Sequence, residues 1–94
     1  MLFRSRNGSV DPVTLVEEAL GRIDNARHLN AVTAVYAEEA LAAARSHTRT
    51  GALAGLPLLV KDMARVKGHI TTAGSTLYAD GPADEVSDAV VQRL

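Results

Sequence analysis

The sequence has 94 residues, a formal net charge of −1 and no cysteine. Such a length suits one small domain or part of a larger one, and the lack of cysteine excludes a disulfide framework and a thiol nucleophile. No basic stripe points to nucleic acid, no apolar run reaches the roughly 18 residues of a membrane helix, and the opening MLFRSRNGSVDP lacks a signal-peptide core. We therefore expect a cytoplasmic protein that binds neither nucleic acid nor membrane.

The first predicted element is a helix from about Pro12 to Arg27. Asp11 is a suitable N-cap and Pro12 a suitable first helical residue, because the missing N–H of proline has no helical partner at that position. The apolar residues after it recur at helical spacing on one face. These are Val13, Val16, Ala19, Leu20, Ile23 and Ala26.

The next segments are AVTAVY (31–36) and AEEALAAARSHTR (37–49). The first favours either a short strand or the start of the following helix. The second predicts a helix, because its residues are strong helix formers and its acidic and basic side chains suit the two ends of the helix dipole. We expect Gly51 to end this helix.

The apolar run Leu56–Val60 predicts a strand buried on both faces. Turns are expected at Gly68 and Gly74, and Asp84 or Ser87 is expected to cap a last helix that begins near Ala89. The alternation of helices with a covered strand indicates an α/β fold. The sequence contains no internal repeat.

Lys61 ends the apolar run and has two interpretations. Its stem can cover apolar surface while the ammonium reaches water. Alternatively, the amine is desolvated at the end of the buried strand and acts as a base or proton shuttle, because burial favours the neutral form of a lysine. Asp62 is awkward as its partner, since neighbouring strand side chains point to opposite faces, and a solvated acid is the simpler interpretation.

Other polar groups give weaker indications. The hydroxyls of TTAGST (71–76) fit a β-branched segment entering a turn, or the lining of a polar pocket. His28, His47 and His69 lie about twenty residues apart without a metal-binding spacing, so no metal site is expected. The acids between residues 80 and 88 fit a solvated loop, and no two of them stand out as a glycosidase-like pair.

The blocks GLPLLVKD and KGHITTAGS, in this order and spacing, resemble the amidase signature family. The similarity extends from about residue 12 to residue 94. It implies the N-terminal part of an α/β fold in which helices cover a mixed sheet, present here as one partial domain over residues 1–94. It further implies a serine hydrolase of carboxylic amides with a Ser–cis-Ser–Lys triad, no metal and no cofactor, in which Lys61 is the triad lysine.

The sequence departs from the family pattern in one important respect. The Gly- and Ser-rich signature that holds both triad serines is absent, and Ser75 and Ser87 do not match it. Met63 replaces an asparagine that is frequent after the Lys-Asp pair. We therefore expect a fragment that is inactive alone and that self-associates or pairs with a complementary chain. The substrate of the complete enzyme is expected to be an amide. The alternative is a non-catalytic α/β interaction module.

Overall fold

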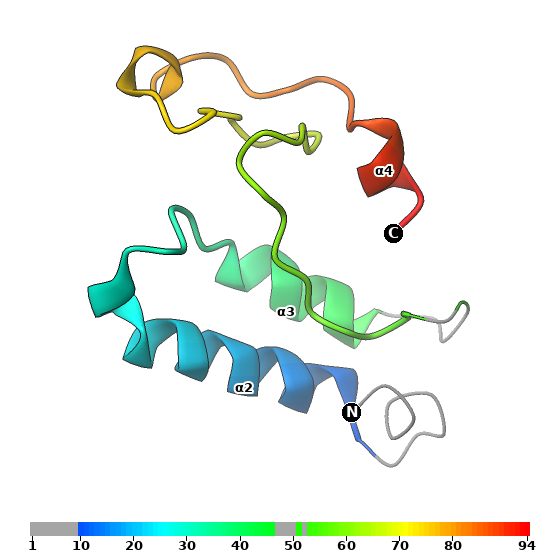
Figure 1. Cartoon of the computed structure of the whole chain (residues 1–94). Helices are drawn as coiled ribbons and strands as arrows, with labels where there is room; N and C mark the ends of the chain where they lie inside the picture. Colours follow the sequence, from blue (N-terminus) through cyan, green and yellow to red (C-terminus); the bar gives the residue numbers. More distant parts are fainter. Residues whose placement is uncertain (1–9, 47–50, 52) are drawn as a thin grey trace. The chain divides into compact units, whose positions relative to one another are not determined.

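The structure is a computed structural model, which describes residues 10–46, 51 and 53–94. The chain divides into two units, Met1–Leu58 and Leu59–Leu94. The described elements are α2 (Pro12–Asn25), the 3-10 helix η1 (Arg27–Leu29), α3 (Ala37–Arg45), the 3-10 helix η2 (Thr76–Tyr78) and α4 (Ala89–Gln92) (Figure 1). Over these residues the structure contains no strand, and none of their helices has the length and apolarity to span a membrane.

Helix α2 confirms the first prediction within two residues of its C-terminal end. Asp11 is the N-cap, with extended backbone (φ −72°, ψ 134°), and Pro12 is the first helical residue. The helix ends at Asn25, where the N–H of Ala26 is shared between the carbonyls of Arg22 and Ile23 (both 3.1 Å) and the chain tightens into η1. The local signals for starting and stopping therefore define this helix.

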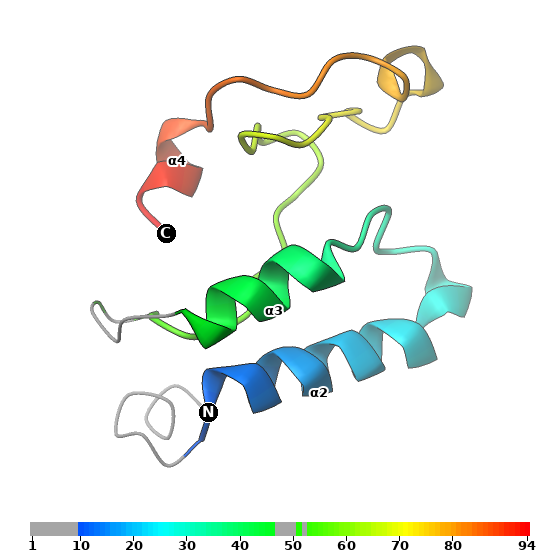
Figure 2. The same ribbon diagram turned by 180° about the vertical axis from the view of Figure 1, so that it is seen from behind.

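Helices α2 and α3 pack side by side in the first unit and run antiparallel (Figures 1 and 2). The core of this unit is small: Leu15 and Val16 are 4% and 6% exposed, and Pro12 is buried beside them. The predicted apolar face included Val16 but missed Leu15. The other members of the predicted face are half-buried, so Leu15 widens the inward side of the helix and does not displace it.

Helix α3 has Glu38 and Glu39 in its first turn and Arg45 in its last, as predicted. It ends at Arg45, and the hydroxyl of Ser46 donates to the carbonyl of Ala42 (3.1 Å). The prediction that this helix ends at Gly51 is therefore wrong: Ser46 is the C-cap, and both its N–H and its hydroxyl bind the carbonyl of Ala42. The remaining predicted helical residues, 47–49, lie outside the described residues.

Neither residues 31–36, before α3, nor residues 56–60, after it, contain a strand. Residues 31–36 have neither helix nor strand, and Tyr36 directly precedes α3. The buried strand expected at Leu56–Val60 is not formed either, and Leu59 is 73% exposed. An apolar run becomes a buried strand only when other strands pair with it, and the described residues supply none. The mixed sheet therefore stays a prediction.

The second unit is held together by pairing between residues 65–69 and 84–88, which run antiparallel. Backbone hydrogen bonds link Gly68 to Asp84 (2.8 Å), Asp84 to His69 (2.8 Å) and Asp88 to Arg65 (3.0 Å). Between them, the N–H of Lys67 donates to the side chain of Ser87 (2.8 Å). This side-chain bond interrupts the ladder, so the two segments do not become regular strands.

Helix α4 begins after Asp88, which is its N-cap residue with extended backbone (φ −62°, ψ 154°). The prediction that Asp84 or Ser87 caps this helix is wrong, because both side chains have other partners. Asp84 accepts from the hydroxyl of Thr71 (2.5 Å), and Ser87 accepts from the backbone of Lys67. The helix is short, and the amide of Gln92 donates to the carbonyl of Ser87 (2.6 Å).

Candidate functional site

Lys61 opens a turn in the second unit. Its carbonyl accepts a hydrogen bond from the N–H of Ala64 (3.0 Å), and its side chain is exposed. The expected burial at the end of a strand is therefore not present in this chain. Among the described residues the ion pairs join Arg27 to Asp24 and Arg65 to Asp88, so the ammonium of Lys61 has no carboxylate partner there.

Asp62 contacts the TTAGST loop through both carboxylate oxygens. Its Oδ1 accepts from the N–H of Thr72 (2.9 Å), and its Oδ2 accepts from the hydroxyl of the same threonine. The hydroxyl and N–H of Thr72 lower the pKa of Asp62, with smaller contributions from the N–H groups of Gly74 and Ala73. Asp62 is half-buried and bound to this loop, because the turn at Lys61 directs the carboxylate there.

The loop itself is a tight turn at residues 72–75. The N–H of Ser75 donates to the carbonyl of Thr72 (2.9 Å), and both central residues have positive φ: 51° at Ala73 and 73° at Gly74. Positive φ at both positions is typical of a type I′ turn. It is natural for glycine and strained for alanine. The turn expected at Gly74 is confirmed, as is the one at Gly68 (φ 86°).

The hydroxyls of this loop mostly organise its own backbone and its neighbours. Thr71 donates to Asp84, Thr72 donates to Asp62, and Ser75 accepts from the N–H of Leu77 (3.2 Å) at the start of η2. Three of the four hydroxyls are therefore engaged in hydrogen bonds, and the lining of a polar pocket stays a prediction.

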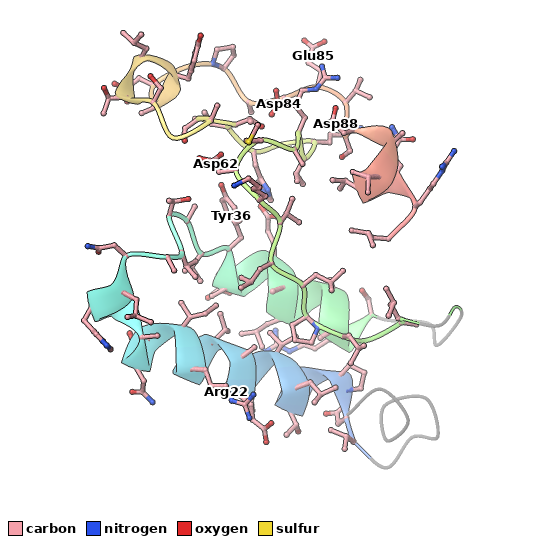
Figure 3. The ribbon with its side chains drawn as sticks, in the orientation of Figure 1. Arg22, Tyr36, Asp62, Asp84, Glu85 and Asp88 are labelled. Carbon is pink, nitrogen blue, oxygen red and sulfur yellow. The ribbon has the colours of Figure 1, made fainter. Side chains whose placement is uncertain are left out.

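A second carboxylate contact joins Arg65 to Asp88. Oδ2 of Asp88 accepts from the backbone N–H of Arg65 and Oδ1 from its Nε, each at 2.8 Å. The backbone bond, followed by the side-chain bond and the charge of Arg65, lowers the pKa of Asp88. Asp84, Glu85 and Asp88 lie along the segment that leads to α4 (Figure 3). Since Asp84 and Asp88 bind partners across the unit, they do not form a facing carboxylate pair.

The three histidines belong to three different segments of the chain. His28 lies in η1 of the first unit, His69 lies in the second unit, and His47 lies outside the described residues. The described part of the chain contains no group of three metal-binding side chains. Sequence reasoning missed the Asp62–Thr72 contact. The signal that could have found it is an acid next to the candidate lysine, ten residues before a Thr-x-Gly turn.

Comparisons with known proteins point to one family. The family model described as Amidase matches residues 14–94. One subunit of the glutamyl-tRNA(Gln) amidotransferase of Burkholderia mallei is 42% identical over 88 residues, covering 87% of this chain and 18% of the relative. The corresponding protein of Deinococcus radiodurans is 38% identical over 80 residues, covering 80% of this chain and 17% of the relative. The chain thus spans less than a fifth of the length of these curated relatives, and no solved structure matches it.

Proposed function

The chain belongs to the amidase family, and from this premise we propose that it is the N-terminal part of an enzyme that cleaves carboxylic amides. The observation that carries the proposal is the family match over residues 14–94, which includes Lys61 and the loop bound to Asp62. In this proposal Lys61 is the triad lysine. The two serines come from sequence outside these 94 residues, so this chain alone is inactive.

The proposed reaction follows the route that the family resemblance implies. The serine oxygen attacks the amide carbonyl, and its proton passes through the bridging serine to the neutral amine of Lys61. The C–N bond then breaks, and ammonia or an amine leaves with that proton. A water molecule cleaves the acyl-serine ester, and the products are a carboxylic acid and the free serine. No metal or organic cofactor takes part.

In this proposal, the remainder of the complete enzyme packs over the exposed side chain of Lys61 and removes water from its amine. A lysine acts as a base when its amine is desolvated, and the side chain is exposed in this chain. The large apolar side chains beside it support such a cover: Leu59 is 73% exposed and Met63 67%. We propose that the mixed sheet of the α/β fold forms when this cover is present and pairs with the segment around Leu56–Val60.

The proposed partners are an amide substrate and a complementary chain. The relatives are named as one subunit of a glutamyl-tRNA(Gln) amidotransferase, which supports assembly with other subunits. The absence of cysteine suits a reducing compartment, and we place the complete protein in the cytoplasm.

A non-catalytic interaction module is the second candidate. It is favoured by the exposed apolar side chains of the second unit, such as Leu77 (87% exposed) and Val86 (60%), which suit a binding surface. This candidate predicts a stable partner complex that is indifferent to Lys61→Met.

A graft tests the proposed function. Residues 14–94 replace the aligned segment of the Burkholderia mallei relative, and the product is assayed in the relative's own amidotransferase reaction beside the isolated 94-residue chain. We expect the graft to be active, and both the isolated chain and the relative without the segment to be inactive. A graft that folds by circular dichroism and elutes like the parent protein, yet lacks activity, contradicts the proposal. So does an isolated chain whose activity disappears in Lys61→Ala.

A further inference from the structure

Three hydrogen bonds hold the chain at Lys61 and Asp62. The carbonyl of Lys61 is bound by the N–H of Ala64 (3.0 Å), and the next side chain, Asp62, is bound to Thr72. The lysine side chain is exposed, so packing does not fix it. A long, flexible side chain of this kind loses much entropy when it is ordered. The position of the Lys61 amine therefore depends on how rigid the backbone of residues 61 and 62 is.

Both carboxylate oxygens of Asp62 accept hydrogen bonds from Thr72. The N–H of Thr72 binds Oδ1 (2.9 Å) and its hydroxyl binds Oδ2, which fixes the plane of the carboxylate as well as its distance. Asp62 is therefore committed to Thr72 and makes no described ion pair with Lys61. This matters chemically, because a lysine that is paired with a carboxylate is held in its protonated form and is a poorer base.

The other end of the contact is also rigid. Thr72 begins the turn in which Ala73 has a φ of 51°, a conformation that an alanine keeps only where the surroundings enforce it. The N–H of Gly74 lies 3.4 Å from the hydroxyl of Thr72, so this hydroxyl contacts both the turn and the carboxylate. The hydroxyl of Thr72 therefore connects the strained turn to the carboxylate of Asp62.

We propose that Asp62 is a positioning residue for Lys61, which holds the lysine backbone against the Thr72–Ser75 turn and keeps its own charge away from the lysine amine. This inference rests on the proposed function of Lys61 as a proton shuttle. In this inference Thr72 is the residue that binds the Asp62 carboxylate and thereby both holds the backbone at Lys61 and keeps the carboxylate away from the amine.

The kinetic test uses the graft with Asp62→Ala, Thr72→Val and Thr72→Ser, and with Thr76→Val as the matched control in the same loop. We expect Asp62→Ala and Thr72→Val to lower kcat by about 10²-fold, the size of a misplaced catalytic group, while KM changes little. Thr72→Ser keeps the hydroxyl and should restore kcat, and Thr76→Val should match the parent graft. Equal kcat values for Thr72→Val and Thr76→Val overturn the proposal.

The pH dependence of kcat separates positioning from a general loss of structure. Thr72→Val removes the hydroxyl bond to Oδ2 of Asp62 and leaves the backbone N–H bond to Oδ1. The carboxylate can then rotate toward Lys61, which should shift to higher pH the part of the kcat profile in which the base loses its proton. Asp62→Ala removes the charge and should not shift this part of the profile to higher pH. If this part of the profile stays in place in Thr72→Val, the proposed control of charge is refuted.

The isolated chain supplies a test that needs no activity. In NMR titrations, Thr72→Val should raise the pKa of the Asp62 carboxyl and speed the exchange of the amide of residue 72, whereas Thr76→Val should do neither. Unchanged values in Thr72→Val overturn the contact itself. An inactive parent graft combined with the expected NMR changes refutes the proposed function and leaves the contact established.

Discussion

The turn at residues 72–75 provides a pair of substitutions with opposite expected signs. Ala73 has a φ of 51° and Gly74 a φ of 73°. An added Cβ at Gly74 would meet no heavy atom within 4 Å, so Gly74→Ala changes backbone conformation energy and introduces no steric clash. Ala73→Gly makes the reverse change at the adjacent position. The two variants therefore isolate the energy of left-handed backbone in this turn.

The expected magnitude follows from two terms. Left-handed backbone costs a residue with a Cβ about 1–2 kcal/mol, and replacing glycine by alanine recovers roughly 0.4–1 kcal/mol through the lower entropy of the unfolded chain. Gly74→Ala should thus destabilise the turn by about 1 kcal/mol, and Ala73→Gly should stabilise it by a similar amount. Each corresponds to roughly a fivefold change in the opening equilibrium, because RT is about 0.6 kcal/mol.

Amide hydrogen exchange at Ser75 measures this equilibrium directly, because its N–H closes the turn onto the carbonyl of Thr72 (2.9 Å). We expect faster exchange in Gly74→Ala and slower exchange in Ala73→Gly, with the amides inside α2 unchanged. Equal exchange in both variants, or the same sign of change in both, would refute the assignment of positive φ to these residues.

Two further predictions concern acid sensitivity and the core. Asp62 and Asp88 have a folded-state pKa below the ordinary 3.8, so their contacts stabilise the second unit above pH 3.8 and weaken as the pH falls through the lowered pKa values. Amide exchange at Thr72 should accelerate in this acidic range, and Asp88→Asn should reduce the acid sensitivity of the unit. Leu15→Ala removes a side chain that is 4% exposed and should lower the free energy of unfolding by about 2–5 kcal/mol, which is measured as a loss of helical circular dichroism. Thr14→Ala, at an exposed position of the same helix, should leave the helical signal unchanged. An equal loss in both variants would contradict the packing of α2 on α3.

The helices could be predicted from the sequence because their signals are local. Asp11 and Pro12 mark the start of α2, and the order of acids and bases in residues 37–45 marks the two ends of α3. The turn glycines are local signals as well, since positive φ at Gly68 and Gly74 depends mainly on the residue itself. These features needed no knowledge of distant parts of the chain.

The strand and the contacts of the site depended on distant residues. Hydrophobicity at Leu56–Val60 gives a tendency to be buried, but it does not supply the strands that would bury it. The contacts of Asp62 with Thr72 and of Arg65 with Asp88 join residues 10 and 23 positions apart. Because several acids and several hydroxyls compete in this segment, residue types alone do not decide which of them meet.

Catalysis by Lys61 is the central claim, and the graft tests it most directly. Lys61→Ala and Lys67→Ala each remove one exposed lysine of the second unit, so they change charge and size equally. In the relative's own reaction, kcat/KM should fall by about 10³-fold or more in Lys61→Ala, as expected for the loss of a triad member, and should stay at the parent value in Lys67→Ala. Equal rates in the two variants would contradict the assignment of Lys61.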